Sequence, residues 1–254
     1  MQLEAHNLHV TVGGIEVCRD LDLVVDRGDI VAILGANGAG KTTLLHTLAG
    51  LRKPDTGRVA LLGRRLDDWT PRERAQRLGI VFQDHQDPLH ASVMQTVLAG
   101  RHPFPGAVAR RDRGRRRHRH RRAGADRHAG EAIAAGVGAF RGERKRVALA
   151  SLLAQRPTVC LLDEPNTHLD LHHQISASDV VIRHVDEHGG SAVMVLHDVN
   201  LALRFCGRAL LLFGDGETLH GAADEVLTSE NLGRLYRHPM REFRDGQSRC
   251  FIPG

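Results

Sequence analysis

The residues best suited to chemistry form a glycine-rich stretch, Gly35 to Thr42, with two glycines, a lysine and a threonine at the spacing of a phosphate-binding loop. Glycines let the backbone turn tightly, so that successive N–H groups point at phosphate oxygens. Lys41 would place positive charge at the β- and γ-phosphates, and the Thr42 hydroxyl would ligate Mg²⁺. The predicted nucleotide-binding residues are Gly35, Ala36, Asn37, Gly38, Ala39, Gly40, Lys41, Thr42 and Thr43.

The segments around this loop are the ones that a phosphate-binding loop requires. Ile30 to Leu34 is a continuous apolar run, typical of a strand buried on both faces. Leu44 to Ala49 has a helical composition, and a helix N-terminus favours a bound phosphate. A chance glycine turn is the alternative interpretation, but the order strand, loop, helix argues against it.

A second apolar run, Val159 to Leu162, ends in two acids, Asp163 and Glu164. A buried strand would hold Asp163 at its tip, where it could bind Mg²⁺. Glu164 could then take a proton from an attacking water as general base. A strand that ends in a solvated acidic turn is common, so this pattern gains its meaning from the phosphate-binding loop before it.

Two more polar side chains follow apolar runs. Gln83 comes after Gly79 to Phe82, and His197 comes after Ala192 to Leu196. Ligands bind at the carboxyl ends of parallel strands, where these residues would meet the two acids. We predict that Gln83 reaches Mg²⁺ or the attacking water and that His197 reaches the γ-phosphate. Either residue alone would more commonly be a surface polar group.

Alternating strand-like and helix-like segments predict an α/β fold. Residues 2–26 alternate around Gly13-Gly14 and predict antiparallel strands joined by a hairpin. Helices are expected over 92–100 and 143–156, and a strand pair is expected around Gly214-Asp215-Gly216. A polar helical tail is expected to close the chain.

The 254-residue chain carries a formal net charge of +5, which taken alone suggests nucleic acid or an anionic membrane surface as a partner. Nine arginines lie between residues 110 and 122, however, and without them acidic residues would outnumber basic ones. The net charge therefore says little about function.

Four dispersed cysteines form no CxxC pair, which favours a reducing compartment over a disulfide framework or a zinc site. The first residues lack the pattern of a signal peptide. No apolar stretch approaches the roughly 20 residues of a membrane helix. We therefore expect a cytoplasmic protein whose membrane role depends on a partner.

The order of these motifs resembles the nucleotide-binding domain of ABC transporters over nearly the whole chain. The resemblance implies a Walker A loop at Gly35–Thr42, a Q-loop at Gln83, a Walker B strand ending at Asp163, a D-loop at Asp170 and a switch histidine at His197. It implies a P-loop NTPase with a mixed sheet core, an N-terminal antiparallel β subdomain and a helical subdomain. The implied division is one domain, 1–254, with its core at 1–83 and 157–254, a helical subdomain at about 84–156, and an anomalous Arg-rich segment at 104–142.

Longer phrases, such as ILGANGAGKTTLLHTLAGL and VLHDVNLALRFC, are similar to ATPases of vitamin B12, iron–siderophore and haem importers. The resemblance implies binding and hydrolysis of ATP with Mg²⁺, a homodimer, and an integral-membrane permease as partner. A periplasmic binding protein would take part indirectly, and no nucleic acid is expected. The chain would lie peripherally on the inner face of the cell membrane.

The sequence departs from the family at the LSGGE signature, which is aligned with Ala139-Phe140-Arg141-Gly142-Glu143. Phe140 replaces the serine that should bind phosphate, and Arg141 replaces a glycine that permits close approach. Because the length is kept while the composition of 104–142 is lost, a reading-frame error is the first explanation. A genuine basic loop and a nucleic-acid-binding arm are the others, although the arm would lack the aromatics that stack on bases.

Two smaller departures are Asn166-Thr167, inverted from the usual order, and Val12, where many relatives place an aromatic residue against adenine. Two other function classes also remain open. One is a non-transport ABC protein of translation or DNA repair, although this chain has neither two cassettes nor a long coiled coil. The other is a degenerate cassette that binds ATP and hydrolyses it poorly.

Overall fold

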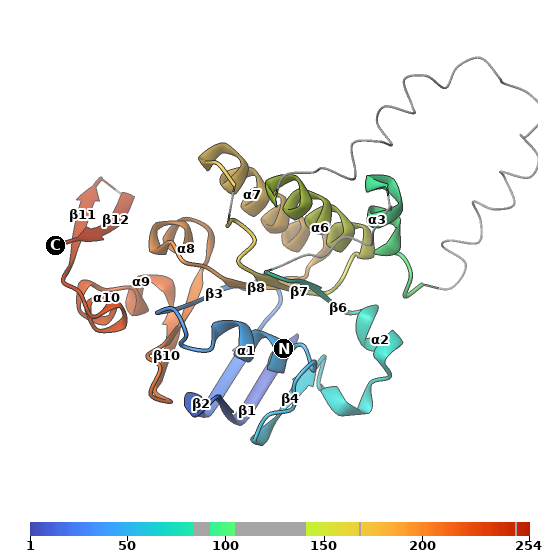
Figure 1. The fold of residues 1–254 in the computed structure, drawn as a ribbon, viewed down its shortest axis with the longest axis horizontal. Helices are drawn as coiled ribbons and strands as arrows, with labels where there is room; N and C mark the ends of the chain where they lie inside the picture. The colour runs from blue at the N-terminus through green and yellow to red at the C-terminus, as the bar shows by residue number, and fades with distance from the viewer. Residues whose placement is uncertain (84–91, 105–140, 168, 247) are drawn as a thin grey trace, which may run out of the picture.

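The computed structural model describes residues 1–83, 92–104, 141–167, 169–246 and 248–254 (Figure 1). A six-stranded mixed sheet runs through the middle of the molecule in the order β10-β9-β3-β8-β7-β6. Its strands are β3 (Ile30–Gly35), β6 (Leu78–Val81), β7 (Val159–Asp163), β8 (Ser191–Val195), β9 (Arg208–Leu212) and β10 (Thr218–Ala222). All pairs are parallel except β9 with β10. The carboxyl ends of β6, β7, β3 and β8 therefore meet at one edge of the sheet.

Both faces of this sheet are covered, which explains why its central strands are apolar throughout. Along β3, Ile30, Ala32 and Leu34 face one core cluster, while Val31 and Ile33 face the other. The first cluster is covered by α6 (Arg141–Gln155), α7 (Leu171–His188), α8 (Val199–Phe205), α9 (Ala223–Val226) and α10 (Ser229–Tyr236). The second contains α1 (Lys41–Leu48), which lies between the main sheet and the N-terminal strands (Figure 1).

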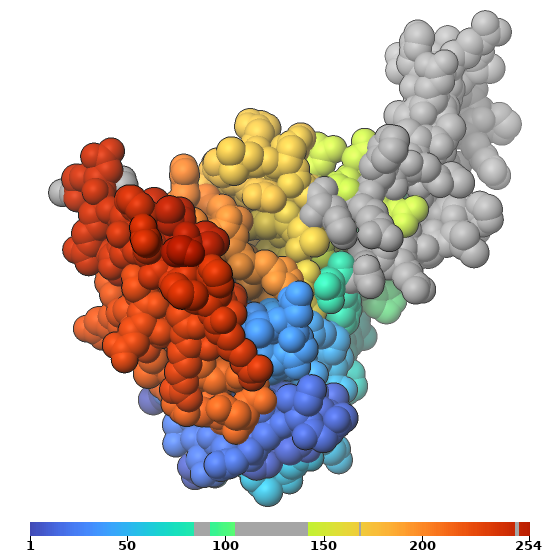
Figure 2. Space-filling view, turned by 60° about the vertical axis from the view of Figure 1, so that its left-hand side comes forward, coloured from blue at the N-terminus to red at the C-terminus, as the bar shows by residue number. Residues whose placement is uncertain are grey.

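The N-terminal strands form a separate antiparallel sheet, β2-β1-β4-β5, as the sequence predicts. It contains β1 (Leu3–Val12), β2 (Ile15–Val25), β4 (Thr56–Leu61) and β5 (Arg64–Arg65). The 3-10 helix η1 (Leu66–Asp68) and the helix α2 (Pro71–Ala75) follow, and a Thr70–Glu73 capping box begins α2. The strands of this sheet lie at the bottom of Figure 2, with β1 and β2 in dark blue and β4 and β5 in light blue.

Two described helices flank the Arg-rich segment. Helix α3 (Val93–Ala99) begins at the capping box of Ser92 and Gln95 and packs on α6. Ser151 of α6 donates its hydroxyl to the Thr96 carbonyl at 3.2 Å. Helix α6 is described from Arg141 onward, and it covers the expected helix from residue 143 to Gln155. The expectations for residues 105–140 lie outside the described residues.

The expected helical tail is wrong in its last part. After α9 and α10 the chain ends in an antiparallel hairpin, β11 (Met240–Asp245) with β12 (Ser248–Pro253). Phe251 is buried in the main core, and its backbone N–H and carbonyl both bond to the side chain of Asn200 in α8. These tertiary contacts stabilise the hairpin, because a two-stranded hairpin alone is marginal in water.

Within the described ranges, no helix is both long and apolar enough to span a membrane.

Candidate active site

The glycine-rich loop joins the carboxyl end of β3 to the N-terminus of α1, as predicted. Gly40 precedes the helix with a φ of 88°, and a Cβ there would collide with the side chain of Val17. A Cβ at Gly35 would lie 2.9 Å from the Leu212 carbonyl oxygen. Both positions therefore require glycine on steric grounds, and the loop conformation depends on them.

Lys41 opens α1 and is buried, with its ammonium turned back into the loop. Its Nζ donates to the carbonyl oxygens of Gly35 at 2.8 Å and Ala36 at 3.0 Å. Desolvation lowers the pKa of Lys41, while the nearby carboxylates of Glu164 and Asp163 act in the opposite direction. A polyanion in the loop would favour the charged ammonium, so binding of phosphates and protonation of Lys41 support each other.

Asp163 ends β7 with no exposed surface, and Thr42 donates its hydroxyl to Asp163 Oδ1 at 3.2 Å. Asp163 Oδ2 has no hydrogen-bond partner among the described residues. Burial raises the pKa of Asp163, and the hydrogen bond from Thr42 lowers it only in part. A buried, ionised carboxylate with one unbonded oxygen lowers the stability of the fold unless a cation binds it.

Thr42 and Asp163 supply too few ligands to hold a cation by themselves, which suits Mg²⁺. Thr42 and Asp163 offer a hydroxyl and a carboxylate side by side. Gln83 donates its amide to the neighbouring Glu164, and its carboxamide oxygen is an atom of the kind that Mg²⁺ prefers. The described residues contain no group of three or more His, Cys, Asp or Glu side chains that could hold a metal. Mg²⁺ commonly takes one or two carboxylates and completes its shell with water and substrate phosphates.

Glu164 follows Asp163, is 7% exposed, and receives three side chains at its carboxylate. His197 Nε2 lies 2.6 Å from Oε1, while Gln83 Nε2 and Thr167 Oγ1 donate to Oε2 at 2.9 and 3.2 Å. Glu164 has a φ of 49°, unusual for a residue other than glycine. The structure thus joins the predicted Glu164, Gln83 and His197 in one network at the sheet edge.

His197 is the exposed member of this network, with 45% of its side chain accessible. A cavity of about 110 Å³ borders Glu164 and His197 and is also lined by Thr167. A water occupies roughly 30 Å³ in the liquid, so the cavity has room for a few waters beside the carboxylate. The arrangement can hold a base, orient its carboxylate and supply it with water.

The sequence reasoning missed Thr167. The order Asn166-Thr167 looked like a minor inversion, but the two side chains have separate partners. Asn166 is buried and donates to Ser178 Oγ at 3.1 Å, while Thr167 contacts Glu164. Only its position in the sequence could have indicated a role for Thr167, because it lies three residues after the predicted general base, Glu164.

The remaining predicted positions lie outside this network. Asp170 caps α7. Its carboxylate accepts from the His173 backbone N–H at 2.9 Å and lies 2.7 Å from His173 Nδ1. Val12 ends β1 and packs against the second core cluster. Phe140 lies outside the described residues, and Arg141 begins α6.

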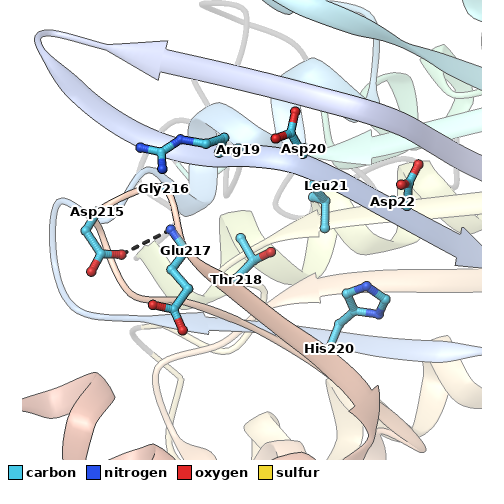
Figure 3. Close-up of a pocket in the computed structure, with 9 residues that line it drawn as sticks. All are labelled: Arg19, Asp20, Leu21, Asp22, Asp215, Gly216, Glu217, Thr218 and His220. Atoms are coloured by element: carbon cyan, nitrogen blue, oxygen red, sulfur yellow. Dashed lines mark hydrogen bonds between the residues drawn. The ribbon is translucent and has the colours of Figure 1, made fainter.

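A larger cavity, about 550 Å³, lies between β2 and the β9–β10 turn and contains none of the predicted site residues (Figure 3). Two of its acids, Asp215 and Glu217, already have partners within the protein. Asp215 accepts from the Glu217 backbone N–H at 3.1 Å, and Arg234 pairs with both acidic side chains. This cavity therefore gives no support for a second reactive site.

Comparison with known proteins agrees with the site. The ABC transporter family pattern matches residues 18–167, more than half of the chain. Hemin import ATP-binding protein HmuV of Pseudomonas aeruginosa is 38% identical, covering 94% of this chain and 96% of the relative. HmuV of Pseudomonas putida is 40% identical, covering 83% of this chain and 82% of the relative.

Among solved structures, the fold is similar to that of the ATP-binding cassette MJ0796, a dimer in a post-hydrolysis state bound to ADP and Pi. The TM-score is 0.68 at 23% identity, over 87% of this chain and 98% of that one. At this identity the likeness concerns the fold.

Proposed function

This chain belongs to the ABC transporter family, and we propose that it is the ATPase subunit of an importer for haem or a related metal chelate. The two HmuV relatives, both named for hemin import, support haem over the cobalamin and iron–siderophore alternatives. The observation that carries the ATPase role is the meeting of Lys41, Thr42, Asp163 and Glu164 at one sheet edge.

The proposed roles follow from the chemistry of each group. Backbone N–H groups of Gly35–Thr43 and the ammonium of Lys41 bind the β- and γ-phosphates of ATP. Thr42, Asp163 and Gln83 hold Mg²⁺, which neutralises phosphate charge when bound.

In the reaction itself, Glu164 takes a proton from the attacking water. The water oxygen bonds to the γ-phosphorus while the bond from that phosphorus to the β–γ bridging oxygen breaks, which leaves ADP and phosphate. Gln83 orients the carboxylate of Glu164, and His197 binds the γ-phosphate from the exposed side.

The proposal extends to the assembly. We propose one ABC domain over 1–254, with core 1–83 and 157–254 and a helical subdomain at about 84–156. Two copies pair so that each nucleotide lies between them, and the pair binds an integral-membrane permease at the inner face of the cell membrane. A periplasmic binding protein would deliver the substrate, and nucleic acid has no part in this scheme.

The experiment is reconstitution with a candidate permease of the haem-importer type from the same organism. The chain and the permease are co-expressed, purified and placed in liposomes, and ATP hydrolysis and uptake are measured with hemin, an iron–siderophore and cobalamin in separate arms. We expect hemin to be taken up only with ATP, and the Glu164→Gln complex to take up none. Uptake of cobalamin or of the siderophore, with no uptake of hemin, would show that haem is not the substrate. Co-purification with RNA or DNA in place of a permease would contradict the transport role.

A further inference from the structure

Lys145, in the second turn of α6, is a buried lysine directed at the active-site edge of the sheet. It is 5% exposed, and its Nζ donates to three backbone carbonyl oxygens. They are those of Phe82 at 2.9 Å, Gln83 at 2.8 Å and Asp163 at 3.2 Å. An ammonium has three N–H donors in a compact group, so one side chain can serve all three acceptors.

The three carbonyls belong to neighbouring strand ends. β6 and β7 are paired in parallel up to Val81 and Leu162, and the next residues continue past the end of the ladder. The bond to the Asp163 carbonyl is buried, where a carbonyl without a donor is costly, and the bonds to the Phe82 and Gln83 carbonyls are partly buried. Lys145 therefore joins the end of β6 to the end of β7 at the point where the ladder stops.

The ends of β6 and β7 are followed by Gln83 and Glu164, whose side chains meet at the proposed general base, Glu164. Gln83, whose carbonyl accepts from Lys145, donates its own amide to Glu164 at 2.9 Å. The Asp163 carbonyl, the third acceptor, is bonded directly to the backbone nitrogen of Glu164. Lys145 thus holds the backbone on both sides of the Gln83–Glu164 hydrogen bond.

We propose that Lys145 is a positioning residue for ATP hydrolysis, which holds Gln83 and Glu164 in the register needed for attack on the γ-phosphate. The inference rests on the proposed ATPase mechanism. Without Lys145, the ends of β6 and β7 can shift relative to each other, and a shift of about 1 Å can cost on the order of 10²-fold in rate. ATP binding through Lys41 and Thr42 does not depend on this contact.

The test is Lys145→Met, which keeps an unbranched apolar stem and removes all three donors. We expect kcat for ATP hydrolysis to fall about 10- to 100-fold, with KM for ATP changing less than about threefold. Lys145→Gln, with two N–H donors, should recover part of the loss. Leu152→Ala is the matched control, because Leu152 is buried on the same helix and packs on β6 at Gly79. It should lower the melting temperature and leave kcat near the wild-type value.

A double-mutant cycle separates positioning from general stability. In a Gln83→Ala background Lys145→Met should cost little further, because the contact that it positions is already gone. Wild-type kcat in Lys145→Met, or an equal loss with and without Gln83, would overturn the proposal. If Lys145→Met fails to fold, Lys145→Gln must show the reduced kcat, and wild-type kcat there would overturn it as well. Failure of the ATPase mechanism itself would appear separately, as wild-type turnover in Glu164→Gln.

Discussion

Asp163 and Glu164 are adjacent, but the fold places their carboxylates in different surroundings. Asp163 is desolvated, receives one hydroxyl, and keeps an oxygen without a partner among the described residues. Glu164 is met by His197, Gln83 and Thr167. Environments that differ in this way assign different roles to two acids. The first suits a metal ligand and the second an oriented base.

Glu164→Gln should retain ATP binding and lose hydrolysis. The amide can still occupy the network but cannot accept a proton, so turnover should fall by roughly 10²–10⁴-fold, as for the loss of a general base. Phosphate release and ATP affinity should be measured on the same preparation. Unchanged turnover would remove Glu164 from the mechanism.

Asp163→Asn should stabilise the nucleotide-free protein at neutral pH, because it removes a buried charge. The folded-state pKa of Asp163 is raised by burial, so its ionisation opposes folding as pH rises through that value. The expected gain is about 1 kcal/mol, or roughly 2–4 °C in melting temperature, and it should vanish below the ordinary Asp pKa of about 4.

The control for this variant is Asp170→Asn, because hydrogen bonds from His173 lower the pKa of Asp170. Its ionised form supports folding above the unfolded pKa, so this change should lower the melting temperature at neutral pH. A melting temperature for Asp163→Asn below the wild-type value at pH 7 would contradict the account of Asp163. Asp163→Asn should also lose the Mg²⁺ dependence of ATP binding.

At the scale of elements, the buried strands were predictable and the C-terminal hairpin was not. The strands β3, β7 and β8 are apolar on both faces, and that pattern is visible in sequence. β11 is largely exposed and rich in charge, and Phe251 of β12 is buried in the core. The hairpin depends on a contact with α8 about fifty residues away, which no local pattern can indicate.

Asn200→Ala should therefore loosen the hairpin without affecting the nucleotide site. The change removes both hydrogen bonds to the Phe251 backbone, so we expect the free energy of unfolding to fall by about 1–3 kcal/mol. Urea unfolding and ATP affinity would be measured in parallel. Arg244→Ala, in the exposed part of the same hairpin, should change stability by less than about 0.5 kcal/mol. Equal effects of the two variants would contradict the role given to Asn200.

At the scale of the whole molecule, motifs from both ends of the chain meet at one edge of the sheet. The phosphate-binding loop, Gln83, Asp163-Glu164 and His197 were predictable, because each follows an apolar run at a recognisable spacing. Lys145 and Thr167 were not, because their importance comes from tertiary contacts, with the backbone at the ends of β6 and β7 for Lys145 and with the Glu164 carboxylate for Thr167. The predicted effect of the altered signature depends on a second copy and stays a prediction.

ATP-driven pairing should be weak in the isolated chain as written, where no permease holds two copies together. In a symmetric pair each ATP would meet the signature of the other copy, where Phe140 lacks a side-chain donor and Arg141 replaces a glycine. Each lost charge-assisted hydrogen bond costs on the order of 1.5–3 kcal/mol, at two equivalent sites. Sedimentation of Glu164→Gln with ATP should show a monomer.

Restoring Leu-Ser-Gly at residues 139–141, with an ordinary helical segment before it, should recover both the dimer and faster hydrolysis. A stable ATP-dependent dimer from the unaltered chain would show that the signature is not needed. Resequencing the DNA for residues 104–142 would decide whether a reading-frame error produced the altered segment.

Calorimetric titration of Mg-ATP into the wild-type chain and into Lys41→Ala shows directly whether Gly35–Thr43 binds the nucleotide. Lys41 supplies the buried positive charge of the loop, and its loss leaves the carbonyls of Gly35 and Ala36 in place. We expect saturable one-to-one binding to wild type, no measurable binding to Lys41→Ala, and matching circular dichroism spectra for the two proteins. Equal affinity of both proteins for ATP would show that Gly35–Thr43 is not the nucleotide site.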